Sequence, residues 1–227
     1  MFHKAFSIPN DPPPTFPILS DLHLEVNHQY SSYDFPICAT HLILAGDVGL
    51  FLVLGNHEFY GESFTEGIER ARNLERESCF HGRLLLLHQR PYDIPRSNIT
   101  VLGCTLWSDV PPQAQEIVQA KIRDFRKVRG WTVDDHNVAR DYEGSRLVTG
   151  GDPAKTQTQQ REVLVVTHHA PSLQGTSIWV FGHTHYTTEF MEGGVRVVSN
   201  QRGYVLPGSE SRTIKDGFDA RKAIRMS

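Results

Sequence analysis

Five short polar motifs, rich in Asp, His and Asn, each follow a run of apolar residues in this chain. In chain order they are Ser20-Asp21-Leu22-His23, Gly46-Asp47, Gly55-Asn56-His57-Glu58, Thr167-His168-His169 and Gly182-His183-Thr184-His185. Carboxylate, imidazole and amide groups together suit ions such as Zn, Mn and Fe, whereas Ca²⁺ prefers shells made of oxygen alone. The residue types therefore predict metal chemistry, and no cysteine is needed for it.

The apolar runs before the motifs predict the elements that position these side chains. Each run is rich in Val, Ile, Leu or Phe and lacks the alternation of a half-exposed strand, which is typical of strands buried on both faces. The runs cover residues 16–19, 42–45, 51–54, 163–166 and 178–181. Because open α/β sheets place their ligands at the carboxyl ends of parallel strands, we expect the five motifs to gather there.

The spacing within the motifs suggests how the ligands would share the ions. Asp21 and His23 stand two residues apart, so in an extended segment both side chains would leave the same side of the backbone and reach one ion. His183 and His185 repeat this spacing. A carboxylate has two oxygens and can bridge two metals held about 3.5–4 Å apart. Asp47 is the natural candidate for such a bridge.

Each motif taken alone is weak evidence, since each has an ordinary structural reading. A Gly-Asp pair after a strand is usually a turn, and a histidine pair at a strand end is often solvated or hydrogen-bonded. Gly-Asn-His-Glu is commonly a simple loop. The inference depends on the conjunction of all five motifs, in this order and each behind a predicted strand.

The motif set resembles that of the calcineurin-like metallophosphoesterase superfamily over residues 18–200. The resemblance implies an α/β sandwich of two mixed sheets flanked by helices. It also implies hydrolysis of a small phosphate ester, a phosphomonoester or a phosphodiester, by a dinuclear centre of Mn, Fe or Zn ions. An activated water would attack phosphorus in line, so no side chain need be a covalent nucleophile and Ser20 is read as structural.

The resemblance further implies a role for each site residue. Two sets of three ligands would each hold one metal, with a carboxylate between the ions. The first set is Asp21, His23 and His185, the second is Asn56, His168 and His183, and the bridge is Asp47. His57 is implied to be catalytic, protonating the leaving oxygen or stabilising the transition state. At the fourth motif His168 or His169 could be the ligand, and His168 is favoured because it is first off the strand.

Composition and charge favour a single domain. With 227 residues, 39% of them hydrophobic, the chain can bury a sizeable core. A net charge of −3 gives no positive field for nucleic acid, which makes a nuclease the less favoured reading. No apolar run is long enough to span a membrane, and residues 1–14 contain no apolar core of the kind that a secretory signal has. Three scattered cysteines predict a reducing, cytoplasmic location, with Cys38, Cys79 and Cys104 as small buried side chains. The oligomeric state stays open.

The chain divides into a Pro-rich lead-in at residues 1–15, a phosphoesterase domain at 16–206 and a polar tail at 207–227, the tail holding a strand fragment and a loose end. Within the domain we predict a solvated helix at 62–77, strands at 84–87 and 99–106, a helix or helix–loop at 111–127, and a helix that starts near Thr132. Trp107 is read as core, and the basic residues near Arg126 as a solvated face.

The link between the second and third strands departs from the family pattern. Only three residues separate Asp47 from the third strand. A parallel crossover ordinarily needs about a dozen residues, because the chain must return a strand length of about 17 Å. Three residues span at most about 11 Å. The link therefore predicts an antiparallel hairpin that would carry Asn56 too far from Asp47 for one metal centre.

The link after the fourth strand is also short, with ten residues from His168 to Ser177. Our hypothesis is that crossover segments are missing from this chain, which would then fold poorly or bind metal in one half-site at most. The alternative function is accordingly a catalytically impaired metallophosphoesterase that serves as a binding or scaffold protein.

Overall fold

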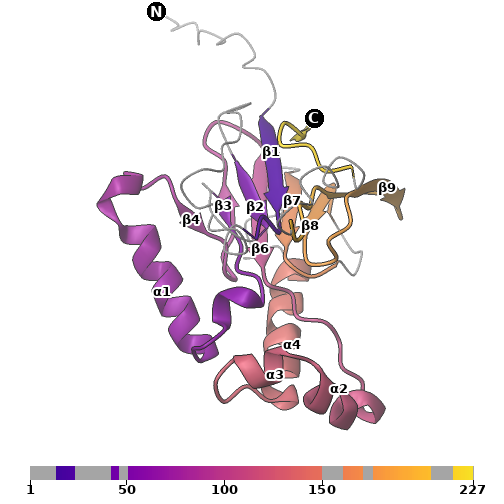
Figure 1. Cartoon of the computed structure of the whole chain (residues 1–227). Coiled ribbons are helices and arrows are strands. Elements are labelled where there is room, and N and C mark those ends of the chain that lie inside the picture. The colour runs from indigo at the N-terminus through magenta and orange to yellow at the C-terminus, as the bar shows by residue number, and fades with distance from the viewer. Residues whose placement is uncertain are drawn as a thin grey trace, which may run out of the picture.

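Two mixed β-sheets packed against each other form the centre of the molecule (Figure 1). The computed structural model describes residues 14–23, 42–45, 51–149, 161–170, 176–205 and 217–226. The first sheet has five strands in the order β11-β1-β2-β3-β4, and the second has six in the order β5-β6-β7-β8-β10-β9. Within each sheet the central strands pair in parallel, and antiparallel partners lie at the edges: β11 in the first sheet, β5 and β9 in the second.

Strands and helices occur in groups along the chain, and their bounds are as follows. The first sheet contains β1 (Thr15–Ser20), β2 (Ile43–Ala45), β3 (Phe51–Leu52), β4 (Leu85–Leu86) and β11 (Ala223–Arg225). The second contains β5 (Tyr92–Asp93), β6 (Ile99–Cys104), β7 (Glu162–Thr167), β8 (Ile178–Phe181), β9 (Thr188–Glu192) and β10 (Val195–Ser199). The helices are α1 (Phe64–Arg76), α2 (Gln115–Lys121), α3 (Asp124–Lys127) and α4 (Val133–Thr149), with short 3₁₀ turns at His57–Phe59, Ser78–Phe80 and Pro112–Ala114.

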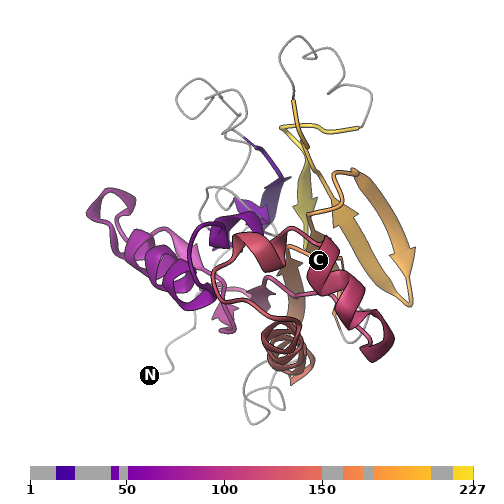
Figure 2. The same cartoon turned by 60° about the horizontal axis from the view of Figure 1, so that its bottom comes forward.

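The period of two in the strands divides their side chains between an inner core and two outer cores. In β7, Leu164 joins the core between the sheets, whereas its neighbour Val165 lies in the core on the outer face. Ile68 of α1 packs with Leu86 on the outer face of the first sheet, and Leu147 of α4 packs on the outer face of the second. The described residues thus form a helix–sheet–sheet–helix arrangement, with α1 and the β9–β10 hairpin at opposite sides (Figure 2). The expected mixed α/β architecture is confirmed.

The predicted local elements between the third and fourth motifs are confirmed. α1 begins with a capping box in which Ser63 and Glu66 bond reciprocally, and Thr132 and Asp135 make the same pair at the start of α4. The strands predicted at 84–87 and 99–106 correspond to β4 and β6, and the segment 111–127 contains α2 and α3. Trp107 is buried in the core, and Arg126 is exposed, as expected.

The predicted antiparallel hairpin between the second and third strands is wrong. β2 and β3 pair in parallel, with Ile43 beside Phe51. A hairpin would be required only between strands of full length, whereas β2 has three residues and β3 has two. The chain therefore returns only about 7 Å to reach the level of Phe51, not 17 Å. β7 and β8, which flank the second short link, also pair in parallel.

In the tail, the predicted strand fragment is confirmed as β11, whereas the predicted loose end is wrong for residues 217–226. β11 pairs with β1, and both Ile224 and Met226 are buried against the inner core. Cys104 is buried as expected, but Cys79 is exposed because it lies in the turn that follows α1; Cys38 lies outside the described residues. In the part of the chain that the structure describes, no helix combines the length and apolar character needed to cross a membrane.

Candidate metal centre

Side chains that follow β1, β3, β7, β8 and β10 meet at one cavity of about 150 Å³. The cavity is lined by Asp21, His23, Asn56, His57, Glu58, His168, His183, His185 and Tyr204. These include every predicted site residue except Asp47, which lies outside the described residues. Motifs far apart in the sequence are therefore brought together at the carboxyl ends of the strands, where ligands of α/β sheets are expected.

Asp21, His23 and His185 form the first group of donors. Each offers a ligand atom, and the three atoms lie within 4.8 Å of one another. The Nε2 atoms of His23 and His185 are 3.0 Å apart, and Asp21 Oδ1 is 3.6 Å from His185 Nε2. Ligands about 2.1 Å from one metal lie about 3.0–3.5 Å from each other in octahedral or tetrahedral shells. The chemistry and spacing of this group fit one ion.

Asn56, His168 and His183 form a second group beside the first. His168 Nε2 is 3.0 Å from Asn56 Oδ1 and 3.2 Å from His183 Nδ1. These separations also match those of ligands around a single ion. Each contact also has the length of a hydrogen bond, so the distances establish convergence of the donors, and the ligand roles stay predictions.

Four of these residues have a left-handed backbone. The angle φ is 49° at Asp21, 45° at His23, 70° at His183 and 53° at His185. Residues with a Cβ rarely adopt such angles, which cost on the order of 1–3 kcal/mol each and concentrate at functional sites. The expected extended geometry of Asp21-x-His23 is therefore wrong, although the two side chains do converge. The rings of His183 and His185 lie in different donor groups, so their spacing of two residues does not bring both rings to one ion.

Long-range hydrogen bonds hold these turns in place. Asp21 accepts two bonds from the backbone N–H of His183, with its carboxylate oxygens at 3.0 and 3.2 Å. The buried Gln201 side chain accepts from the backbone N–H of His185 at 2.5 Å and donates to Thr184 Oγ1 at 2.9 Å. No motif marks Gln201, so the sequence gives no sign of its role. These hydrogen bonds hold the backbone at angles that it would otherwise rarely adopt.

Gly55 allows the third and fourth motifs to approach each other. A Cβ at this position would lie 2.7 Å from Cε1 of His168 and 2.8 Å from Oε2 of Glu58, closer than real Cβ contacts. The Gly55 N–H donates to that same Glu58 oxygen at 2.5 Å. Glu58 lines the cavity but received no role from the sequence; its place in Gly-Asn-His-Glu was the signal. Glycine is needed here because the His168 ring fills the space of a side chain.

The two neighbouring histidines of the fourth motif have different surroundings. His168 lines the cavity, whereas His169 is buried, and both its backbone nitrogen and Nδ1 approach the carbonyl oxygen of Thr105 at 3.0 and 3.2 Å. Its ring packs 4.2 Å from the ring of His183. Burial holds the pKa of His169 well below its usual range, so the ring is neutral. His168, which was favoured as the ligand, is the one of the two that lines the cavity, and its role as a ligand stays a prediction.

His57 and Tyr204 form the aromatic part of the cavity wall. The ring of His57 stacks on Tyr60 with a centroid separation of 4.6 Å and lies 5.4 Å from the ring of His23. Tyr204 stacks on His23 at 4.0 Å while half of its surface is exposed. Tyr204 was not foreseen, because a lone tyrosine after a strand carries no signal.

His185 is a cavity residue whose pKa is shifted by burial. Burial lowers the pKa of this imidazole below its usual value, and the nearby Asp21 carboxylate opposes the shift without cancelling it. His185 is therefore neutral near pH 7, which is the form that binds metal.

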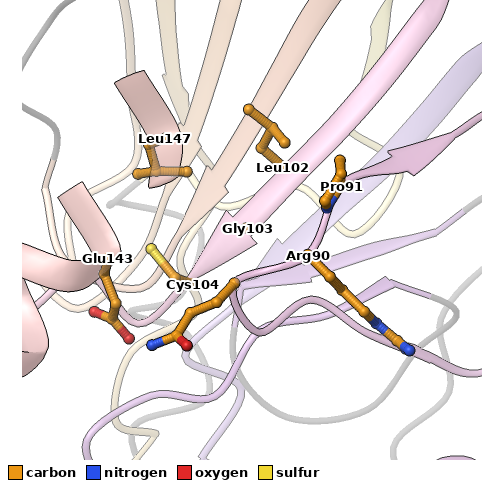
Figure 3. Close-up of a pocket in the computed structure, with 8 residues that line it drawn as sticks. Arg90, Pro91, Leu102, Gly103, Cys104, Glu143 and Leu147 are labelled. Atoms are coloured by element: carbon orange, nitrogen blue, oxygen red, sulfur yellow. The ribbon is translucent and has the colours of Figure 1, made fainter. Parts of the chain in front are cut away.

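A second cavity, of about 10 Å³, lies between α4 and β6 (Figure 3). Cys104 and Glu143 are among its lining residues, together with Leu102 and Leu147. Burial raises the pKa of the fully buried Glu143 to about 8. The space suffices for about one water molecule. It contains none of the predicted site residues, so the larger cavity is the candidate functional site.

Comparison with known proteins found no family model that matches the chain. Uncharacterized protein L509 of Acanthamoeba polyphaga mimivirus is 23% identical to this chain. The alignment spans 265 residues and covers 82% of this chain and 90% of the viral protein. The alignment is therefore longer than the 227 residues of the chain itself. The viral protein therefore has internal segments with no counterpart here.

Among solved structures, phosphopantetheinyl hydrolase (PptH) from Mycobacterium tuberculosis is similar to this chain. The TM-score is 0.64 at 14% sequence identity, and the match covers 94% of this chain and 96% of that one. At such low identity the likeness establishes the fold alone. The chain therefore shares the fold of a known hydrolase.

Proposed function

We propose that this chain is a metal-dependent phosphoesterase of the calcineurin-like metallophosphoesterase superfamily, hydrolysing a phosphomonoester or a phosphodiester at a dinuclear centre. One observation carries the proposal: two groups of three donors lie side by side in one cavity. They come from distant parts of the chain, since His23 and His185 are 162 positions apart and their rings are in contact. Such convergence is expected of a metal centre and is hard to explain by core packing, because the side chains are polar.

The ligand sets follow from the two groups. The first ion would be held by Asp21, His23 and His185, and the second by Asn56, His168 and His183. Asp47 is proposed as the carboxylate shared by both ions. Imidazole with carboxylate and amide oxygen suits Mn, Fe or Zn.

The bound ions and the side chains of the cavity would have different roles in the reaction. Ions bound there would polarise the phosphoryl oxygens and lower the pKa of a water molecule. His57, on the cavity wall between Tyr60 and His23, would give a proton to the leaving oxygen or stabilise charge on it. Ser20 is buried outside the cavity lining, which agrees with a structural role.

The proposal is tested by metal analysis combined with turnover of chromogenic phosphate esters. The purified chain, loaded with Mn²⁺ or Zn²⁺, should bind two equivalents and hydrolyse p-nitrophenyl phosphate, bis(p-nitrophenyl) phosphate or both. The ratio of the two rates would identify the ester class. A chain that binds no metal, or hydrolyses both esters no faster than buffer with free metal, would contradict the proposal.

A second candidate is a non-catalytic binding protein that keeps the metal site. It is favoured by one observation, that the viral relative carries internal segments which this chain lacks. Those segments agree with the hypothesis that crossover segments are missing from this chain, while β2–β3 and β7–β8 pair in parallel without them. Two bound equivalents with no turnover of either ester would favour this candidate.

A further inference from the structure

Asp124 contacts the third motif from outside the cavity. It is the first residue of α3, and only 7% of it is exposed. Its Oδ1 accepts a hydrogen bond from Asn56 Nδ2 at 2.9 Å and another from the Tyr60 hydroxyl at 2.6 Å. Asn56 Nδ2 also lies 3.3 Å from the Tyr60 oxygen. A carboxylate, an amide and a phenol therefore form one network behind the cavity wall.

The network determines which end of the Asn56 amide faces the cavity. An amide has one oxygen, which accepts, and one NH₂ group, which only donates, whereas a carboxylate only accepts. Asp124 can therefore bond the NH₂ group and not the oxygen, and the oxygen turns toward His168, 3.0 Å away. Only the oxygen can bind a cation. A flipped amide would aim two N–H groups at the ion and place its oxygen against the carboxylate.

Backbone bonds fasten α3 to the segment that carries Asn56. The Gly61 N–H donates to the carbonyl of Lys127 at 2.8 Å, and the Arg129 N–H donates to the carbonyl of Glu62 at 2.7 Å. The outward side of α3 is basic and exposed, as the sequence predicted, whereas Asp124 and Phe125 are its buried residues. The short helix is thereby fixed in the place from which its carboxylate meets the third motif.

The same carboxylate also orients the support of His57. The Tyr60 ring stacks on His57, and its hydroxyl is held by Asp124. We propose that Asp124 is a positioning residue that fixes the Asn56 amide with its oxygen toward the second ion and holds Tyr60 against the face of His57. The inference rests on the proposed dinuclear function, and it adds a residue on α3 that none of the five motifs contains.

The test compares metal binding by the full chain and its variants, with Mn²⁺ titrated into metal-free protein by calorimetry. Asp124→Ala should weaken one of the two equivalents by about 10- to 100-fold, as is usual when a residue that orients a ligand is lost, and leave the other unchanged. The matched control is Asp134→Ala, which removes an exposed carboxylate at the start of α4. Thermal unfolding of each metal-free variant separates this effect from loss of folding.

A rescue variant distinguishes amide orientation from general damage. In Asp124→Ala/Asn56→Asp the ligand presents an oxygen in either orientation, so the weakened equivalent should regain affinity. Asn56→Asp alone should bind worse than the double variant, because two carboxylates would then be in contact. Tyr60→Phe should keep both equivalents and lower kcat by about two- to tenfold, the worth of one hydrogen bond.

The outcomes separate this inference from the proposed function. If the wild-type chain binds two ions and Asp124→Ala binds both with unchanged affinity, the role of Asp124 is overturned and the dinuclear function stands. Failure of the double variant to recover would likewise overturn the orientation argument. If the wild-type chain binds fewer than two ions, the dinuclear function fails, and the role of Asp124 falls with it.

Discussion

The two donor groups of the cavity are built in different ways. All three residues of the first group, Asp21, His23 and His185, have a left-handed backbone. In the second group only His183 has such a backbone, with φ 70°. Asn56 has an ordinary helical backbone with φ −67°, and His168 packs against Gly55. All of the first half thus depends on strained local turns, whereas the second half has one strained residue and depends mainly on close packing and on Asp124.

The His183-Thr184-His185 turn connects the two halves. His185 contacts His23 in the first group, and His183 contacts His168 in the second. Because one turn supplies a ring to each side, and Asp21 accepts from the backbone of His183, the groups are fixed relative to each other. The difference between the halves therefore concerns how each is held, and the comparison predicts that variants can disturb one half at a time.

His57 belongs to neither half, and its removal should have the largest effect on rate. His57→Ala should lower kcat by about 10²–10⁴-fold, the usual worth of general acid–base catalysis, with both metal equivalents retained. Steady-state kinetics with metal analysis of the same sample would measure this. His81→Ala, at an exposed histidine, is the control. Loss of an equivalent in the His57 variant would make His57 a ligand instead.

Variants of the ligands should separate the halves. His23→Ala should weaken mainly the first equivalent and His168→Ala mainly the second, each by more than about 10-fold, because a direct ligand is worth at least as much as its outer partner. Asp47→Asn should weaken both, since a shared carboxylate offsets the repulsion between two cations. Elemental analysis after dialysis against a chelator gives the stoichiometry. Tight binding of two ions by the Asp47 variant would show that the bridge lies elsewhere.

The packing that holds the second half can be tested at Gly55. Gly55→Ala should destabilise the chain by about 1–3 kcal/mol, because the new Cβ would overlap the His168 ring. Gly144→Ala, in α4 with no atom near the added Cβ, should instead stabilise by up to about 1 kcal/mol. Urea unfolding of both variants measures the contrast. Equal stabilities would mean that the close approach at Gly55 is absent.

Glu143 provides a pH test away from both halves. Burial raises its pKa from 4.5 to about 8, so the folded chain keeps a proton that the unfolded chain releases above pH 4.5. Its contribution to stability is present at low pH and falls by ~1.4 kcal/mol per pH unit until about pH 8. Glu143→Gln should remove this fall and leave the metal content unchanged. Unfolding free energies at pH 5, 6, 7 and 8 would reveal it; parallel pH profiles for both proteins would argue against a buried neutral carboxyl.

The sequence could predict the parts of the site that lie in short motifs, and it could not predict contacts between distant positions. The convergence of Asp21, His23, His183 and His185 could be expected because each pair follows a predicted strand, although their left-handed backbone could not. Contacts that join distant positions carry no such signal. Asp124 meets Asn56 across 68 positions, and this pairing depends on where α3 packs.

The number of paired residues in a strand was also not predictable from the sequence. The apolar run at 51–54 is buried throughout, but only Phe51 and Leu52 pair as β3, so the return path between β2 and β3 is short. Burial could be predicted from the apolar residues, whereas the number of paired residues depends on the neighbouring strand. The expected hairpin failed for this reason.

The central claim is that the two halves hold two neighbouring ions. A crystal of the full chain grown with Mn²⁺ and measured at the Mn absorption edge tests it directly. The account predicts two anomalous peaks about 3.5–4 Å apart, one beside Asp21, His23 and His185 and the other beside Asn56, His168 and His183. A single peak, or peaks that lie away from these side chains, would contradict it.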